Sequence, residues 1–176
     1  MDEKKYFKLS KELSEIYLEI KAILLLSEDE DINQRIILTC INELRNAFDH
    51  TMKTFSEGES LEENFKKAVG HLYRAGFDAY EVISISIIKH IQDIRKNFSF
   101  EAIVTAYPDY YKKILPTIEK IKRAKVRARS NKTVKDNVSP EEHFKEYEKI
   151  VKDIIILKEE MDLHITGIKD AQISIR

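Results

Sequence analysis

The residues best suited to chemistry lie in one short run, Arg45-Asn46-Ala47-Phe48-Asp49-His50. The imidazole of His50 can exchange a proton near neutral pH, and the guanidinium of Arg45 can hold an anionic oxygen with two hydrogen bonds. On a helix, Asn46 and His50 share one face, whereas Arg45 lies about 140° around the axis from His50. The spacing therefore permits acid–base chemistry on an anionic substrate if the long side chain of Arg45 reaches around the helix.

This run resembles the signature of the HEPN superfamily of helical bundles, in which an Arg is followed after four to six residues by a His. Asn46 matches the polar residue that often follows the Arg, while Met52 stands where some members carry a Tyr. The resemblance covers this helix and the all-helical pattern. It implies a metal-independent endoribonuclease of toxin–antitoxin, abortive-infection or CRISPR-linked defence systems, with two protomers sharing one cleft. The 2′-hydroxyl of RNA would attack the neighbouring phosphorus, with His50 and Arg45 as catalytic residues and Asn46 in support.

A second polar group follows along the chain, where His71, Arg74, Asp78 and Glu81 step by three and four residues. If this helix pairs with the helix of His50, His71 and Arg74 line the same cleft. The alternative is a solvated stripe in which Arg74 pairs with Asp78. Two glycines in the same stretch, at positions 70 and 76, indicate a close approach between helices, because glycine weakens a helix interior by about 1 kcal/mol relative to alanine.

Positive charge is concentrated in residues 112–135, which hold ten Lys or Arg and one acid, so that the rest of the chain carries a net charge of −10. Such a segment can bind RNA phosphates, and Tyr107, Tyr110 and Tyr111 before it can stack on bases. The alternative is a charged helix face that docks on an acidic region of this chain, a partner or a second copy. The RNA-binding residues expected from this segment are Arg123, Lys125, Arg127 and Arg129.

Motifs for phosphate loops and metal centres are missing from the sequence. The four glycines never fall in a phosphate-loop spacing, and no His has a Glu three residues before it, as di-iron bundles require. Glu160 and His164, four residues apart, fit an exposed pair better than a metal site. Cys40, the only cysteine, fits a small core residue. We therefore expect no metal and no cofactor.

The periodicity predicts an all-α fold, a single antiparallel bundle of about five helices in one domain of residues 1–176. Ser99 and Ser139-Pro140 mark two helix starts, Pro108 and Pro116 predict a kinked or broken helix, and residues 130–138 predict a loop. The apolar stripe expected to face the core from the second helix comprises Ile37, Ile41, Leu44, Phe48, Met52 and Phe55.

Composition limits the function classes. The 176 residues carry a net charge of −1, which excludes a broadly basic nucleic-acid wrapper, and 43% of them are hydrophobic, enough for a core. No apolar run approaches the ~20 residues of a membrane span, and a lone cysteine fits a reducing cytoplasm. The sequence thus predicts a cytoplasmic protein, with a homodimer, RNA and a protein partner such as an antitoxin as expected interactions. The function expected is an RNA-cleaving toxin or antiphage defence effector; the alternative is a non-catalytic helical interaction module with the same fold.

Overall fold

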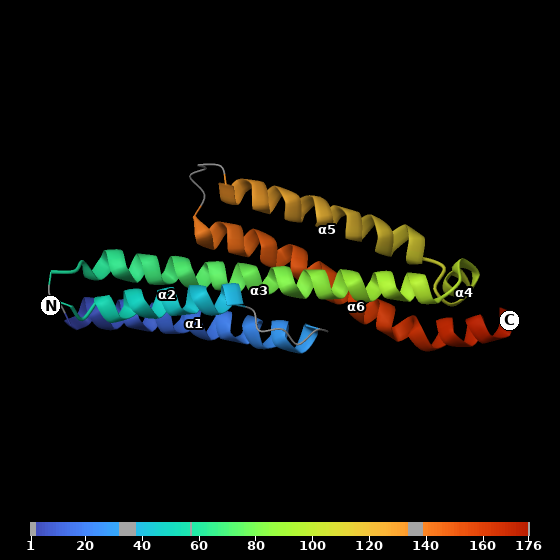
Figure 1. Cartoon of the computed structure of the whole chain (residues 1–176), viewed down its shortest axis with the longest axis horizontal. Helices are drawn as coiled ribbons and strands as arrows, with labels where there is room; N and C mark the ends of the chain where they lie inside the picture. Colours follow the sequence, from blue (N-terminus) through green and yellow to red (C-terminus); the bar gives the residue numbers. More distant parts are fainter. Residues whose placement is uncertain (1–2, 32–37, 57, 134–138, 176) are drawn as a thin grey trace. The chain divides into compact units, whose positions relative to one another are not determined.

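The computed structural model describes the backbone of residues 3–31, 38–56, 58–133 and 139–175, and the side chains of all of these except 127–133. This part of the chain forms six α-helices and no strand (Figure 1), so the all-α prediction is confirmed. The count is six instead of about five, because Pro108 lies in a break that separates a short helix from the next one. The helices are α1 Glu3–Glu30, α2 Leu38–Lys53, α3 Leu61–Asn97, α4 Phe100–Ala106, α5 Tyr110–Thr133 and α6 Pro140–Ile175.

Helix boundaries follow local chemistry at the two predicted caps. The backbone N–H of Ala102 donates to Ser99 Oγ at 3.2 Å at the start of α4. At the start of α6, the N–H of Glu142 donates to Ser139 Oγ at 3.2 Å, and the N–H of Ser139 donates to Glu142 Oε2 at 2.9 Å. Pro116 lies inside α5 without ending it, and α5 continues to Thr133. The predicted loop at 130–138 is therefore wrong for 130–133, and its remainder lies outside the described residues.

The chain divides into two compact units, Met1–Ile83 with Val138–Lys145, and Ser84–Asn137 with Glu146–Arg176. In the first unit, α1 and α2 lie along the N-terminal part of α3 (Figure 1). Gly76 of α3 allows this packing, because a Cβ there would lie 2.5 Å from Ile20 Cδ1 and 2.6 Å from Phe144 Cε2. The close approach predicted for the glycines is thus confirmed at Gly76. At Gly70 a Cβ would meet only ordinary contacts, at 3.6 Å or more.

The orientation of α2 differs from the prediction. The residues it buries are small, Cys40 and Ala47, with Thr54 just beyond its end. Four residues of the predicted inward stripe are exposed instead: Phe48 is 65% exposed, and Ile41, Met52 and Phe55 are also exposed. Of the other two, Leu44 is half-buried and Ile37 lies outside the described residues. We call the four exposed residues, together with Leu38, which is also exposed, the α2 apolar face. Small residues let α2 approach α3 closely, and this contact, instead of burial of the large side chains, fixes the rotation of the helix.

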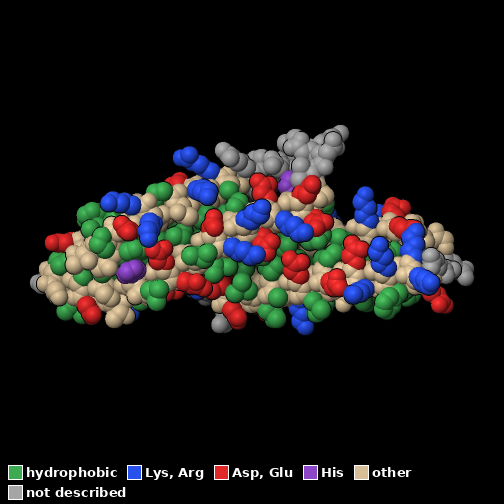
Figure 2. Space-filling model, turned by 180° about the vertical axis from the view of Figure 1, so that it is seen from behind, with side chains coloured by type: hydrophobic (Ala, Val, Ile, Leu, Met, Phe, Trp, Pro, Cys, Tyr) green, Lys and Arg blue, Asp and Glu red, His purple; other side chains and the backbone are tan. Residues whose placement is uncertain are grey.

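In the second unit, the core is made mainly of isoleucines and tyrosines from α3, α4, α5 and α6. Tyr107 and Tyr110 are buried there, so the expectation that these two rings stack on bases is wrong. Tyr111 is half-buried and packs against Phe100 and Tyr110. Tyr107 stacks instead on His164, with ring centroids 4.1 Å apart. On the face shown in Figure 2, basic and acidic side chains are interspersed with hydrophobic ones.

Candidate functional site

A pair of histidines from two helices forms the centre of the candidate site, in the first unit. The imidazole of His50 on α2 lies parallel to that of His71 on α3, with ring centroids 5.3 Å apart and an interplanar angle of 18°. Arg74 Nη2 lies 2.7 Å from His71 Nδ1. The prediction that His71 approaches His50 if the two helices pair is therefore confirmed, and Arg74 contacts the ring of His71.

The hydrogen bonds of Asn64, a residue that is 3% exposed, show which ring nitrogen of His50 carries the proton. The amide nitrogen of Asn64 donates to Glu59 Oε2 and to the Ser60 carbonyl, both at 3.0 Å. Turning the amide over would place its oxygen against both acceptors, so Asn64 Oδ1 is the atom that faces His50 Nδ1, at 2.9 Å. His50 Nδ1 therefore donates to Asn64 Oδ1, and Nε2 is the ring nitrogen left to gain or lose a proton.

The second ring is held by a carboxylate. His71 Nδ1 lies 2.7 Å from Glu43 Oε2, to which Arg74 Nε also donates at 3.0 Å. Nδ1 cannot both donate to Glu43 and accept from Arg74, and we assign it as the donor because an ionised carboxylate only accepts. Burial acts to raise the pKa of Glu43, but the hydrogen bonds from His71 and Arg74 outweigh it and lower that pKa. The carboxylate is thus ionised, and Nε2 is again the free ring nitrogen.

Arg45 and Asn46 are not part of this cluster. Arg45 is exposed and lies on the helix between members of the α2 apolar face, and no hydrogen bond or ion pair joins it to His50 within the described residues. Asn46 is half-buried on the same side of α2 as His50. The structure thus brings together His50, His71 and Arg74 of the predicted site residues, while Arg45 points elsewhere.

Sequence reasoning missed Glu43, Asn64 and Glu59. Glu43 lies seven residues before His50, a spacing that returns to the same helix face and that the sequence displays. Asn64 carries no comparable signal, because it is the turn between α2 and α3 that brings this residue to His50.

A cavity of about 490 Å³ opens beside His71, between α3 and the start of α6. Its cationic lining includes Lys66, Lys67 and Arg74, and its acidic lining is Glu63 and Glu141. The two acids are neutralised by lysines, since Lys67 pairs with Glu63 at 2.7 Å and Lys145 with Glu141 at 2.7 Å. No ion pair joins Lys66 to another described residue. Arg74 is paired with Glu43 at 3.0 Å, so Lys66 supplies the positive charge that the cavity offers to an anion near His71.

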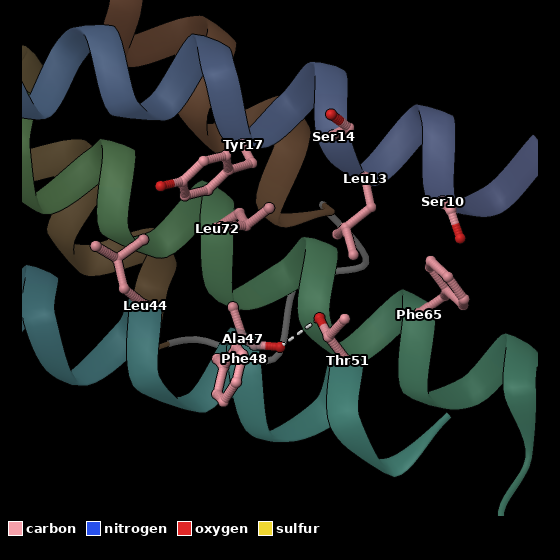
Figure 3. A pocket seen from close by; sticks show the side chains of 10 residues that line it. All are labelled: Ser10, Leu13, Ser14, Tyr17, Leu44, Ala47, Phe48, Thr51, Phe65 and Leu72. Carbon is pink, nitrogen blue, oxygen red and sulfur yellow. Dashed lines mark hydrogen bonds between the residues drawn. The ribbon is translucent and has the colours of Figure 1, made fainter. Parts of the chain in front are cut away.

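An apolar groove of about 400 Å³ lies on the other side of α2, between α1 and α3 (Figure 3). Leu44, Ala47 and Phe48 reach it from α2, Leu13 and Tyr17 from α1. The hydroxyl of Thr51 is satisfied within the helix, donating to the Ala47 carbonyl at 2.8 Å, so it adds no free donor to the groove. This groove continues the exposed α2 apolar face and suits an apolar partner instead of a polar substrate.

The basic segment belongs to the second unit. Arg123 is exposed and lines a cavity of about 720 Å³ between α5 and α6, which also holds Glu119, Glu146 and Asp153. Lys125 is half-buried, and burial lowers its pKa. The side chains of Arg127 and Arg129 lie outside the described residues.

Metal ligands do not gather in the described part of the chain, where no group of three His, Cys, Asp or Glu side chains could hold a metal ion. Glu160 accepts a hydrogen bond from Lys113 at 3.1 Å. Cys40 is buried and its Sγ donates to the Ala75 carbonyl at 3.5 Å; burial raises its pKa to about 12, as fits a core residue.

None of the described helices has both the length and the apolar character needed to cross a bilayer. Comparison with family models, curated proteins and solved structures yields no match for this chain. The geometry of the site is therefore the basis of any functional assignment.

Proposed function

We propose that this chain is a metal-independent endoribonuclease whose proton transfers take place at the His50–His71 pair. The observation that carries the proposal is the hydrogen bonding of the two rings, since each Nδ1 is held by a partner and each Nε2 is left to exchange a proton. RNA supplies its own nucleophile, the 2′-hydroxyl, so that imidazoles can catalyse cleavage by moving protons alone.

Binding of the RNA backbone is supported by the cavity beside His71, where Lys66 adds positive charge near the imidazole. Phosphate contacts of this kind supply affinity without regard to base sequence. We assign the basic segment, with Arg123, Lys125, Arg127 and Arg129, as a second RNA-binding surface. The HEPN-like run 45–50 supports a biological role as a toxin or antiphage defence effector.

Pairing of two copies is part of the proposal. The five residues of the α2 apolar face, each about half exposed or more, form an exposed apolar surface of the kind that a stable interface buries. Arg45 lies within this face and would join the interface. His50 lies on the opposite side of α2, so each chain holds a complete histidine pair.

The test is cleavage of a labelled total-RNA pool by purified protein in EDTA. Wild type and Arg45→Ala are compared with His50→Ala, and His90→Ala serves as the control, because His90 also makes a side-chain hydrogen bond, to Asp162 at 2.8 Å. We expect His50→Ala to lose cleavage and His90→Ala to retain it. Equal cleavage by all variants would assign the activity to a contaminant or another site.

The α2 apolar face also supports a second candidate function, a non-catalytic interaction module that binds a protein partner such as an antitoxin. Five large apolar side chains in solvent are unusual for a protein that acts alone. Expression separates the two functions, since an active ribonuclease toxin arrests growth and the His50→Ala variant relieves the arrest, whereas a binding module gives the same growth with either protein.

A further inference from the structure

We propose that the exposed side of α2 pairs with the same side of a second copy in antiparallel orientation, so that the guanidinium of Arg45 rests on the ring of Phe48 of the second copy. This inference rests on the pairing of two copies in the proposed function. It adds the orientation and register of the pair, and it gives Arg45 the role of selecting that orientation.

The exposed residues of α2 follow the spacing of a coiled-coil seam. They alternate at intervals of three and four residues, which correspond to the a and d positions of a heptad, and we call these six positions the α2 seam: Leu38, Ile41, Arg45, Phe48, Met52 and Phe55. Phe55 lies in the turn that continues α2, where its N–H donates to the Met52 carbonyl at 3.1 Å. On a helix the six positions lie within an arc of about 100°. The α2 seam thus has the pattern that a second helix covers.

The order of the intervals makes the α2 seam complementary to itself. The spacing three, four, three, four, three reads the same in both directions, so a copy turned end for end presents its side chains at matching heights. A two-fold axis between Arg45 and Phe48 then gives three kinds of layer, each made twice: Leu38 with Phe55, Ile41 with Met52, and Arg45 with Phe48. A shift by one heptad would leave the last two positions of each seam without a partner. Full overlap therefore buries the most apolar surface.

The charge of Arg45 decides between the two orientations. In a parallel pair in register, each a position faces its own copy, so two guanidiniums would meet between apolar layers. Bringing two like charges together out of water is destabilising. In the antiparallel pair, the planar guanidinium meets an aromatic face, whose π electrons attract a cation. Asp49, the exposed residue after Phe48, adds a carboxylate at the edge of the same layer, where its Oδ2 also pairs with Lys53 at 2.8 Å.

The rest of the first unit agrees with a second copy at this place. No hydrogen bond or ion pair joins Arg45 to another residue of the described chain, so the second copy supplies the complement that the chain itself does not. Phe48 also lines the apolar groove between α1 and α3, which a copy on the α2 seam would adjoin (Figure 3). His50 lies about 170° around α2 from the middle of the α2 seam, so the pairing leaves the histidine pair uncovered.

Disulfide trapping tests the orientation. Ile41→Cys and Met52→Cys place thiols at positions that are 49% and 48% exposed, and that share a layer only in the antiparallel pair. Each variant is oxidised alone and in an equal mixture, after time for the copies to exchange, and the products are separated by non-reducing electrophoresis. Wild type controls for the native Cys40, which is 1% exposed. Ile156→Cys, at a position that is 59% exposed on α6, controls for chance collisions.

We expect the mixture to give a cross-linked dimer that approaches half of the chains. Either variant alone should give about tenfold less, because like positions then lie beyond the ~7 Å between Cα atoms that a disulfide can span. Wild type and Ile156→Cys should remain unlinked. Adding Arg45→Leu removes the charge that opposes parallel pairing, so Ile41→Cys should then also cross-link alone.

The contrary outcomes are distinct. Cross-linking of Ile41→Cys and of Met52→Cys each with itself overturns the antiparallel orientation. A dimeric mass in light scattering with no cross-link in either sample overturns the α2 seam as the interface. If Ile41→Cys with Arg45→Leu stays unlinked alone, the selecting role of Arg45 is overturned. All three results leave the ribonuclease proposal standing, because cleavage of the RNA pool is measured separately, whereas a monomeric wild type overturns the pairing in the proposed function as well.

Discussion

His50 and His71 lie with their rings parallel, 5.3 Å between centroids, although 20 residues and a turn separate them in the chain. Each ring is tied at Nδ1 by a different kind of partner, an amide for His50 and a carboxylate for His71. This relationship gives two neighbouring imidazoles distinct chemical surroundings, the arrangement that acid–base catalysis with two groups requires.

Replacing His50 with Ala should reduce RNA cleavage by about 10²–10⁴-fold and also lower stability. The helix position alone, about 160° from Phe48, suggests that truncation opens no core cavity, but the structure places His50 against a buried amide. Loss of the ring leaves Asn64 Oδ1 without this donor, which costs about 1–3 kcal/mol. Circular dichroism melting should therefore show a decrease of several degrees, and His90→Ala, on a more exposed pair, should show a smaller one.

Two glycines in α3 make a matched pair for testing helix packing. Gly76→Ala should destabilise the fold, because its Cβ would overlap Ile20 and Phe144 in the packed first unit. Gly70→Ala meets only ordinary contacts, so the better helix propensity of alanine should raise stability by about 0.5–1 kcal/mol. Urea unfolding of both variants measures the sign of the change in the free energy of unfolding. A stabilised Gly76→Ala would contradict the close packing.

Local signals in the sequence were sufficient for the helix boundaries that depend on local chemistry. Ser99 and Ser139 cap helices through hydrogen bonds to residues three positions away. Pro108 lies in the break between α4 and α5, as expected of a residue that disfavours a helix interior. The approach of His71 to His50 also followed from pairing two polar stripes. Predicting these features does not require knowing how each helix is rotated about its axis.

The rotation of α2 could not be predicted from periodicity. An apolar stripe marks a face that avoids water, but the pattern does not say whether this chain or another molecule covers it. Here the small side chains of Cys40 and Ala47 face α3 and expose Phe48. That rotation carries Glu43 to His71, a contact between residues 28 positions apart. Arg45 lies about 140° around α2 from His50 at any rotation of the helix, so it faces away from the histidine pair.

The basic segment should contribute salt-dependent RNA affinity. Replacing Arg123, Lys125, Arg127 and Arg129 with Gln should flatten the slope of log affinity against log salt by about one for each RNA phosphate that the variant no longer neutralises. The half-buried Lys125 should contribute least, and the single variants measure this. Unchanged binding at low and high salt would make the segment a packing or partner surface.

Glu43 should make the stability of the first unit depend on pH. Its pKa is lowered on folding from an ordinary value of 4.5, so its contribution to the free energy of unfolding is complete above that value and disappears as the pH falls through the folded value. Wild type should exceed Glu43→Gln in stability at pH 7, and the difference should shrink below pH 4.5. Urea titrations at both pH values measure it, with Glu148→Gln as the control of similar exposure. A difference that grows in acid would contradict the assigned hydrogen bonds.

The α2 apolar face should hold two copies of the chain together. Phe48→Ser combined with Phe55→Ser removes two rings that are 65% and 61% exposed, so it should weaken pairing, while within the chain it removes one ring contact, between Phe55 and Tyr6 at 5.6 Å. Light scattering at micromolar concentration should change from the mass of a dimer to that of a monomer, while far-UV circular dichroism keeps its helical signal.

Ile156→Ser is the control, because Ile156 is 59% exposed on α6 in the second unit. The control should leave the dimer intact, since Ile156 belongs to the second unit, whereas the α2 apolar face and its adjacent groove belong to the first. A strictly monomeric wild type would contradict the homodimer and would indicate that this face binds a different protein. Dissociation by Ile156→Ser but not by the double variant would place the pairing surface on the second unit instead, and Arg45 would then have no part in it.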